Sequence, residues 1–247
     1  MSGQGPHLDA WARAELYARL PITTADRWWL ELARAAEGPV LELGAGAGRL
    51  TAALCDLDLE VTAVERDPAM LAALRDRVGD RAEVLAADVT DLPAGPPAAL
   101  VLLATSLLNE QADPAARRRL LERAASRCAD GGQVALQVLG PWWLTSMPDR
   151  SVGELLPLDG SPAVRVTIEA GELDPWTARR RATLSYRFPD GALLTDRLDA
   201  AIVLGPELLD GFDGAGLRLV TGRGIEPPAA PGVDQSVWYL LAEPAPR

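Results

Sequence analysis

The feature that most constrains the fold of this chain is the stretch "PVLELGAGAGRLT" (39–51), in which three glycines follow an apolar run. Residues 39–43 are predicted to form a buried strand, and residues 48–57 a helix. Such a unit places backbone N–H groups and a helix N-terminus at the carboxyl end of the strand. Glycine is required there because a Cβ would hold a ligand away from the backbone. We therefore predict a nucleotide-binding βα unit.

The alternation of strand and helix signals continues along the chain. Asp-Pro pairs at 67–68 and 113–114 predict helix starts, and the run at 98–104 is apolar throughout, as in a parallel strand covered on both faces. Predicted strands lie at 59–65, 82–88, 98–104, 133–139, 217–223 and 236–243. The pattern predicts an α/β fold with a doubly wound, mostly parallel sheet of seven strands.

After residue 140 the pattern changes to period-2 and β-branched segments at 162–170, 179–188 and 192–204. Pro189-Asp190-Gly191 predicts a hairpin turn between the last two. We therefore expect an antiparallel β arm inserted after the fifth strand. The predicted division is an N-terminal helical cap (1–36), a Rossmann-like domain (37–140 and 205–247) and a β-rich arm or lid (141–204).

The composition of the chain argues against several classes of partner, metal site and catalytic mechanism. The 247 residues carry a net charge of −11, which argues against nucleic acid as a partner. The first residues lack the features of a signal peptide, and no apolar run is long enough to span a bilayer, so we expect a cytoplasmic protein without a membrane partner. One histidine, His7, and two distant cysteines, Cys55 and Cys128, argue against a metal site. Lysine is absent, which excludes a Schiff-base lysine, a P-loop lysine and a Tyr/Lys catalytic pair.

The spacing of the glycines leaves two ligand classes in competition, dinucleotides and S-adenosylmethionine (SAM). The dinucleotide fingerprint is G-x-G-x-x-G. Here Gly44, Gly46 and Gly48 alternate with alanines, and Arg49 occupies the position of the third glycine of that fingerprint. Close packing of the helix on the strand would be harder at an arginine, and the dehydrogenase Tyr/Lys pair is missing. Both departures disfavour a dinucleotide.

Four elements in order carry a resemblance to a known family: "VLELGAGAG" (40–48), the acidic Glu65 ending the second strand, "AAD" (86–88) followed by "VTDL", and "GGQVALQVL" (131–139). Over about residues 36–140 the chain resembles the class I (Rossmann-like) SAM-dependent methyltransferases of the small-molecule, natural-product type. The resemblance implies SAM as the cofactor and S-adenosylhomocysteine (SAH) as its product.

The resemblance also implies roles for individual residues. Glu42 lies near the amino acid end of the cofactor, Glu65 accepts the two ribose hydroxyls, and Asp88 accepts from the adenine amine while Val89 donates its N–H. Alternatives from the residues alone stay open, because Glu65 could be a solvated strand-end carboxylate and Asp88 a turn residue. The full set of expected cofactor-binding residues is Tyr17, Glu42, Gly44, Ala45, Gly46, Gly48, Glu65, Arg66, Met70, Asp88, Val89, Ala104 and Thr105.

In that set, Arg66 and Met70 are expected to flank the adenine ring. Ala104 and Thr105 would lie beside the sulfonium. Tyr17 resembles an N-terminal tyrosine that closes over the cofactor in related enzymes, with ordinary core packing as the alternative.

Acceptor-side candidates follow the fourth and fifth strands. Asn109 and Glu110 are the catalytic candidates, with Glu110 holding or deprotonating an ammonium, unless it is a solvated carboxylate at a helix start. Trp142 and Trp143 in "GPWWL" are expected to line the acceptor site, against an alternative of core packing or arm anchoring. The arginine runs 117–119 and 179–181 are expected to be solvated.

Methyl transfer from a sulfonium depends largely on holding the nucleophile against the methyl group. A neutral amine has a lone pair, whereas a hydroxyl needs help in losing its proton. Since the chain lacks lysine and has one histidine near its N-terminus, we expect N-methylation, ahead of O- or C-methylation, of a small molecule or short peptide in specialised metabolism. The [DNS]-P-P-[YFW] tetrapeptide of amino-group DNA and protein methylases is absent, because residues 104–110 read "ATSLLNE". The alternatives are a SAM-binding enzyme that catalyses a cyclisation or other non-transfer reaction, and a non-catalytic SAM-binding partner protein.

Overall fold

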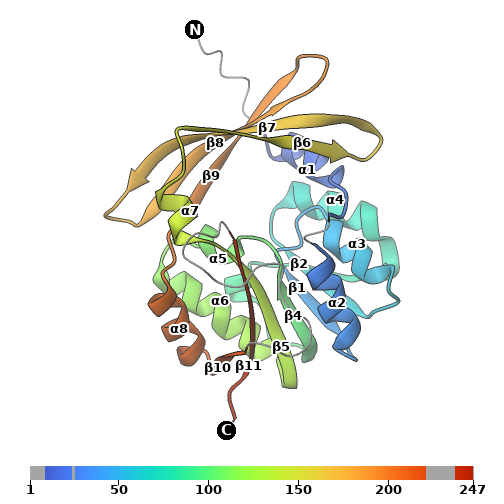
Figure 1. Cartoon of the computed structure of the whole chain (residues 1–247). Helices are drawn as coiled ribbons and strands as arrows, with labels where there is room; N and C mark the ends of the chain where they lie inside the picture. The colour runs from blue at the N-terminus through green and yellow to red at the C-terminus, as the bar shows by residue number, and fades with distance from the viewer. Residues whose placement is uncertain (1–8, 24–25, 221–236, 247) are drawn as a thin grey trace.

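The structure is a computed structural model that describes residues 9–23, 26–220 and 237–246. Two superposed layers of sheet dominate it (Figure 1): a seven-stranded sheet flanked by helices, and a four-stranded sheet lying across its upper end in the view. His7 and the Pro-rich stretch at 227–231, which sequence patterns place in a terminal segment and a loop, lie outside the described residues.

The seven-stranded sheet has the order β10-β11-β5-β4-β1-β2-β3. Strands β1 to β5 pair with one another in parallel, whereas β11 pairs antiparallel with β5 and with β10. This confirms the prediction of a mostly parallel seven-stranded sheet. Its strands are β1 (Val40–Leu43), β2 (Val61–Glu65), β3 (Glu83–Ala86), β4 (Ala98–Leu103), β5 (Cys128–Leu139), β10 (Leu217–Val220) and β11 (Val237–Pro244).

Helices cover both faces of this sheet, as a doubly wound fold requires. One apolar cluster joins α2 and α3 to one face, α4 adds to the same face, and a second cluster joins α6 and α8 to the other. Arg117 is buried and pairs with Glu207 of α8, so the expectation that this arginine is solvated is wrong. The helices are α1 (Ala10–Ala18), α2 (Arg27–Ala35), α3 (Arg49–Cys55), α4 (Pro68–Val78), α5 (Leu107–Glu110), α6 (Pro114–Arg127), α7 (Pro141–Thr145) and α8 (Gly205–Gly214), with short 3-10 turns η2 (Gly79–Arg81) and η3 (Val89–Asp91).

The second sheet is an antiparallel meander in the order β6-β7-β8-β9. Its strands are β6 (Arg150–Leu158), β7 (Ser161–Asp174), β8 (Arg179–Arg187) and β9 (Leu193–Ala201). The hairpin between β8 and β9 confirms the predicted turn at 189–191, with Phe188 N donating to Ala192 O at 2.9 Å. Sequence patterns missed β6, because Gly153 and Pro157 interrupt its alternation. The division of the chain into a cap, a Rossmann-like domain and an arm stays a prediction.

Arg179 to Arg181 are also not a simple solvated run. Arg180 is buried and donates to the carbonyls of Gly171 and Met147. Arg179 and Arg181 both pair with Asp199 on the neighbouring strand.

Two helices join the layers. In Figure 1, α7 lies where the chain leaves β5 for the four-stranded sheet, and α1 lies between that sheet and α4. Among the helices that the structure describes, none is long and apolar enough to cross a membrane.

Candidate active site

The glycine loop between β1 and α3 has the conformation that its sequence requires. Gly44, Gly46 and Gly48 have φ angles of 72°, 57° and 78°, in the left-handed region that side chains disfavour. The N–H groups of Gly44 and Ala45 both donate to the carbonyl of Val64, at 2.9 and 3.0 Å. These bonds turn the loop over the carboxyl ends of β1 and β2, beside the point where the strand order reverses. Ligands of open α/β sheets bind at such a point.

The three glycines differ in what surrounds them. A Cβ at Gly48 would lie 2.6 Å from a methyl carbon of Leu74 in α4, and one at Gly44 would lie 3.2 Å from Leu107 in α5. A Cβ at Gly46 would meet no protein atom within 4 Å. Gly48 therefore serves helix packing, whereas Gly46 leaves an open approach to the backbone, as a bound cofactor needs.

Glu65 joins the two loops that border this open approach. Its carboxylate accepts from the N–H of Gly46 at 2.9 Å and from the N–H groups of Arg66 and Asp67, both at 2.8 Å. Three backbone donors fix the carboxylate at the carboxyl end of β2. Oε2 accepts only the bond from Gly46 and so keeps a lone pair for a further donor such as a ribose hydroxyl.

Asp88 follows β3 and caps η3. It accepts from the N–H and hydroxyl of Thr90 at 2.8 and 2.7 Å, and from Arg66 Nη1 at 2.7 Å. Desolvation raises the pKa of Asp88, but the bonds from Thr90 and Arg66 more than offset it, so the pKa is lowered. Arg66 and Asp88 are thus brought together, and an adenine amine bound at Asp88 would share the carboxylate with Arg66.

Met70 and Val89 are buried in two different apolar clusters. Met70 packs with Ala14 of α1, Ala47 of the glycine loop and Ala69, whereas Val89 belongs to the cluster under α6. Their expected contacts with the cofactor stay a prediction.

Glu42 is a fully buried carboxyl under the glycine loop. Its Oε2 accepts from the hydroxyl of Thr51 in α3 at 2.6 Å. Burial raises the pKa of Glu42 to about 7, and the negative charges of Glu65 and Asp26 add to the rise, while Thr51 and Arg49 oppose it. A positively charged group near Glu42, such as an ammonium, would favour its ionised form.

Glu110 ends α5, directly after β4. Its carboxylate is exposed and accepts from Ser106 Oγ at 3.3 Å. Desolvation by surrounding protein raises the pKa of Glu110, and the charge of Glu65 raises it further. Among the described residues no arginine forms an ion pair with it, so its charge is open to a ligand. Ala104 is half-buried and Thr105 exposed in the same βα turn.

The structure contradicts the expectation that Asn109 contacts the acceptor. Its side chain is fully buried, with Oδ1 accepting from Leu139 N at 2.8 Å and Nδ2 donating to the carbonyls of Ala201 at 2.9 Å and Leu139 at 3.3 Å. Every polar atom of the amide is therefore used within the protein. Asn109 is a structural residue that ties the end of β5 to the end of β9.

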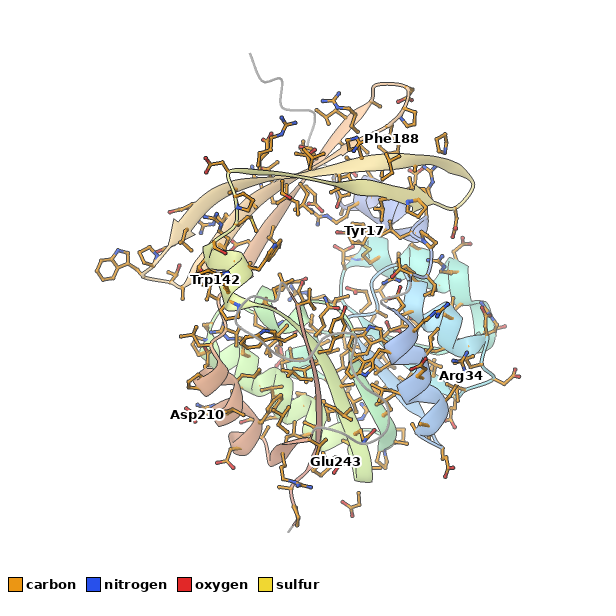
Figure 2. All side chains as sticks on the ribbon, in the orientation of Figure 1. Tyr17, Arg34, Trp142, Phe188, Asp210 and Glu243 are labelled. Atoms are coloured by element: carbon orange, nitrogen blue, oxygen red, sulfur yellow. The ribbon has the colours of Figure 1, made fainter. Side chains whose placement is uncertain are left out.

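The tryptophans of α7 differ from each other. Trp142 is 57% exposed on the helix that leads into the four-stranded sheet (Figure 2). Trp143 is half-buried and packs against a cluster that includes Leu144, Met147 and Ala182. The packing of Trp143 favours the anchoring alternative for that residue. A substrate contact by either residue stays a prediction.

Tyr17 lies on α1 beneath the four-stranded sheet (Figure 2) and belongs to two apolar clusters. One contains Ala47 and Met70 on the cofactor side, and the other contains Tyr186 of β8. The hydroxyl groups of Tyr17 and Tyr186 share a hydrogen bond. Desolvation, together with nearby Asp196, raises the pKa of Tyr17 despite that bond.

The sequence patterns did not predict two ion pairs near the site. Arg13 of α1 binds Asp196 of β9 through Nε and Nη2, at 2.9 and 2.5 Å. Arg49, at the start of α3, binds Asp26 just before α2. Because each ion pair joins residues that are far apart in sequence, no local motif predicts it. Arg49, which replaces a glycine of the dinucleotide fingerprint, thus anchors the segment before α2.

Comparison with known proteins agrees with this geometry. Residues 40–132 match the methyltransferase domain family. The sequence is 54% identical over 54 residues to ribosomal RNA small subunit methyltransferase A of Anaeromyxobacter dehalogenans (strain 2CP-C). That match spans 22% of this chain and only 19% of the relative's length. It does not decide whether this chain acts on nucleic acid, and the expectation that it does not stays a prediction.

Similar solved structures extend over nearly the whole chain. The CcbJ methyltransferase from Streptomyces caelestis is 21% identical with a TM-score of 0.77, covering 94% of this chain and 96% of its own. The sugar N-methyltransferase KedS8 from Streptoalloteichus sp ATCC 53650 is 18% identical with a TM-score of 0.71, covering 100% and 97%. The glycopeptide N-methyltransferase MtfA in complex with SAH is 20% identical with a TM-score of 0.60, covering 98% and 100%.

The residues at the carboxyl edge of the sheet fit SAM. The open backbone at Gly46 and the carboxylates of Glu42 and Glu65 offer groups suited to its amino acid and ribose parts. The domain match supports the same cofactor. Residues 40–132 therefore match the methyltransferase domain family, in a chain that has the Rossmann-like fold of the SAM-dependent methyltransferases.

Proposed function

We propose that this protein is a SAM-dependent methyltransferase that acts on an amine nitrogen of a small molecule or short peptide in natural-product biosynthesis. The observation that carries the proposal is the open approach to Gly46, bordered by Glu65 and lying over the buried Glu42. SAM supplies a methyl group on a sulfonium sulfur, and the protein must hold the acceptor in line with it.

The preference for an amine rests on Glu110. At neutral pH a free amine is mainly an ammonium, which must lose a proton before its nitrogen can attack. An exposed carboxylate that pairs with no arginine among the described residues attracts the ammonium, and a raised pKa makes it a better proton acceptor than an ordinary glutamate. Glu110 would therefore hold the acceptor and receive its proton.

The names of similar structures support nitrogen as the acceptor atom. KedS8 is called a sugar N-methyltransferase and MtfA a glycopeptide N-methyltransferase. At 18–20% identity they share the fold with this chain. Within the proposal, the ribose binds Glu65, the adenine amine binds Asp88 with Val89 N, and Tyr17 covers the cofactor.

Calorimetric titration with SAH tests the cofactor site directly. Wild type is expected to bind SAH, and Glu65→Ala is expected to weaken binding by about tenfold or more, the equivalent of about 1.4 kcal/mol or more. Glu60→Ala is the matched control, because Glu60 is exposed at the amino end of the same strand. Equal SAH affinity in all three proteins would refute the assignment of Glu65.

A mass-shift screen with SAM over amines, phenols, short peptides and ribosomal RNA tests the acceptor class. The expected result is a gain of one or more methyl groups on an amine, with Glu110→Gln shifting the pH profile of kcat/KM. Methylation confined to RNA would contradict the proposal. SAH binding with products that never gain a methyl group would favour a non-transfer enzyme instead.

A further inference from the structure

The helix α1 contacts both layers of the molecule. Ala14 and Tyr17 pack with Ala47 of the glycine loop and Met70 of α4. Leu16, together with Tyr17, packs with Val164 and Tyr186 on the inner face of the four-stranded sheet. A nine-residue helix thus forms part of the wall of the cofactor site and part of the support of the second sheet.

Two polar contacts reinforce the side that faces the second sheet. Arg13 and Tyr17 are four residues apart, on one face of the helix. Arg13 binds Asp196 of β9, and Tyr17 binds Tyr186 of β8. Leu184 pairs with Asp196 across the two strands, so Tyr186 and Asp196 lie on the same face of the sheet.

The Arg13–Asp196 pair is built more firmly than the surface pairs of this protein. The Asp196 side chain is 7% exposed, and its carboxylate receives two guanidinium bonds and the N–H of Arg197. By contrast, Arg81 and Asp56 form a pair with side chains 48% and 68% exposed. An exposed pair contributes little, whereas a buried carboxylate that loses its partner is costly.

The end of α1 is also attached to the second sheet. Asp159, in the β6–β7 turn, donates its N–H to the carbonyl of Arg19 at 2.7 Å and lies 3.7 Å from Arg77 of α4. Helix α1 therefore cannot shift on the glycine loop without pulling on three strands of the sheet. The positive charge of Arg13 is among the influences that oppose the rise in the pKa of Glu110.

We propose that Arg13 is a positioning residue: by binding Asp196 it couples occupancy of the cofactor site to the placement of the four-stranded sheet over the acceptor. This rests on the proposed function. A ligand packed beside Ala47 and Met70 stabilises α1 in its present position, and Arg13 transmits that stabilisation to β9. Coupling between sites is reciprocal, so an ordered sheet also favours cofactor binding.

Hydrogen–deuterium exchange with and without SAH tests the coupling without needing the acceptor. In wild type, SAH is expected to slow exchange in residues 40–55 and also, by roughly fivefold or more, in α1 and in residues 193–201 of β9. Arg13→Leu is expected to retain the SAH effect at 40–55 and lose it at 193–201. Arg81→Leu, which removes an exposed pair, is the matched control and should behave as wild type.

The single variant leaves Asp196 buried without its partner, so a second variant separates instability from lost coupling. Arg13→Leu/Asp196→Leu removes both charges and should recover thermal stability while the SAH effect on 193–201 stays lost. Persistence of that effect in the double variant overturns the proposal. So does wild type that binds SAH without any change at 193–201, whereas wild type that fails to bind SAH contradicts the proposed function itself.

Discussion

Glu42 and Asp196 are both buried carboxyls, one in each layer of the molecule, and they are stabilised differently. Asp196 forms a bidentate salt bridge with Arg13. Glu42 has a hydroxyl from Thr51, and among the described residues no arginine pairs with it, so burial raises its pKa to about 7. The ion pair of Asp196 stabilises the folded protein. Glu42 has no cationic partner among the described residues, and it lies where we expect the ammonium of the cofactor. We therefore expect cofactor binding to supply the positive charge that folding does not.

The same contrast exists within the glycine loop, between Gly48 and Gly46. Gly48→Ala should destabilise the protein by roughly 4 kcal/mol, because it combines a left-handed φ with a clash against Leu74. Gly46→Ala should cost only about 1 kcal/mol, because no protein atom lies near the added methyl. It should still weaken SAH binding by about tenfold. Urea unfolding and calorimetry measure the two quantities. Similar unfolding free energies for the two variants would show that Gly46 also serves packing.

Glu42→Gln should reveal the uncompensated charge through pH. The pKa of Glu42 rises from 4.5 in a solvated glutamate to about 7 in the fold, so wild type binds more protons folded than unfolded between these values. Its stability therefore falls as pH rises through this window. Relative to wild type, the variant should gain about 3 kcal/mol between pH 4.5 and 8. Below pH 4 the difference should be independent of pH.

Thermal or urea unfolding of both proteins across this pH range gives the measurement. Thr51→Val is a useful companion, because loss of its hydrogen bond should raise the pKa of Glu42 further. A constant difference between Glu42→Gln and wild type at all pH values would show that Glu42 is ionised at neutral pH in the free protein.

Asn109→Ala tests the joint between the two layers. The loss of an amide that makes three internal hydrogen bonds should cost about 2 kcal/mol in unfolding free energy. Because the side chain does not reach the site, the KM for SAM should stay near that of wild type. A large fall in kcat at unchanged stability would return Asn109 to the list of catalytic candidates.

Sequence patterns anticipated the cofactor layer better than the layer above it. The strand, the three glycines and Glu65 lie within 27 consecutive residues, and parallel strands bring their carboxyl ends together whatever the rest of the chain does. Local order is enough to place them. The seven-stranded sheet and the β8–β9 hairpin are confirmed for the same reason.

The misses arise from contacts between distant segments. Arg13 and Asp196 are 183 residues apart, and neither belongs to a motif. Asn109 resembled an acceptor contact because it follows β4, and only the return of β9 at Ala201 buries it. The strand β6 was missed because Gly153 and Pro157 break its alternation, and Arg117 because its partner Glu207 comes from a helix 90 residues later.

The hydrogen bonds of the Asn109 amide also bear on which part of the fold can be changed without disturbing the rest. It bonds to Leu139 and to Ala201, so the inserted segment leaves the sheet and returns at almost the same point. Insertions whose ends lie close together disturb the host domain least. We therefore expect the β6–β9 segment to tolerate lengthening or replacement while the seven-stranded sheet folds unchanged. Such changes would alter the second sheet through two short junctions and leave the glycine loop as it is.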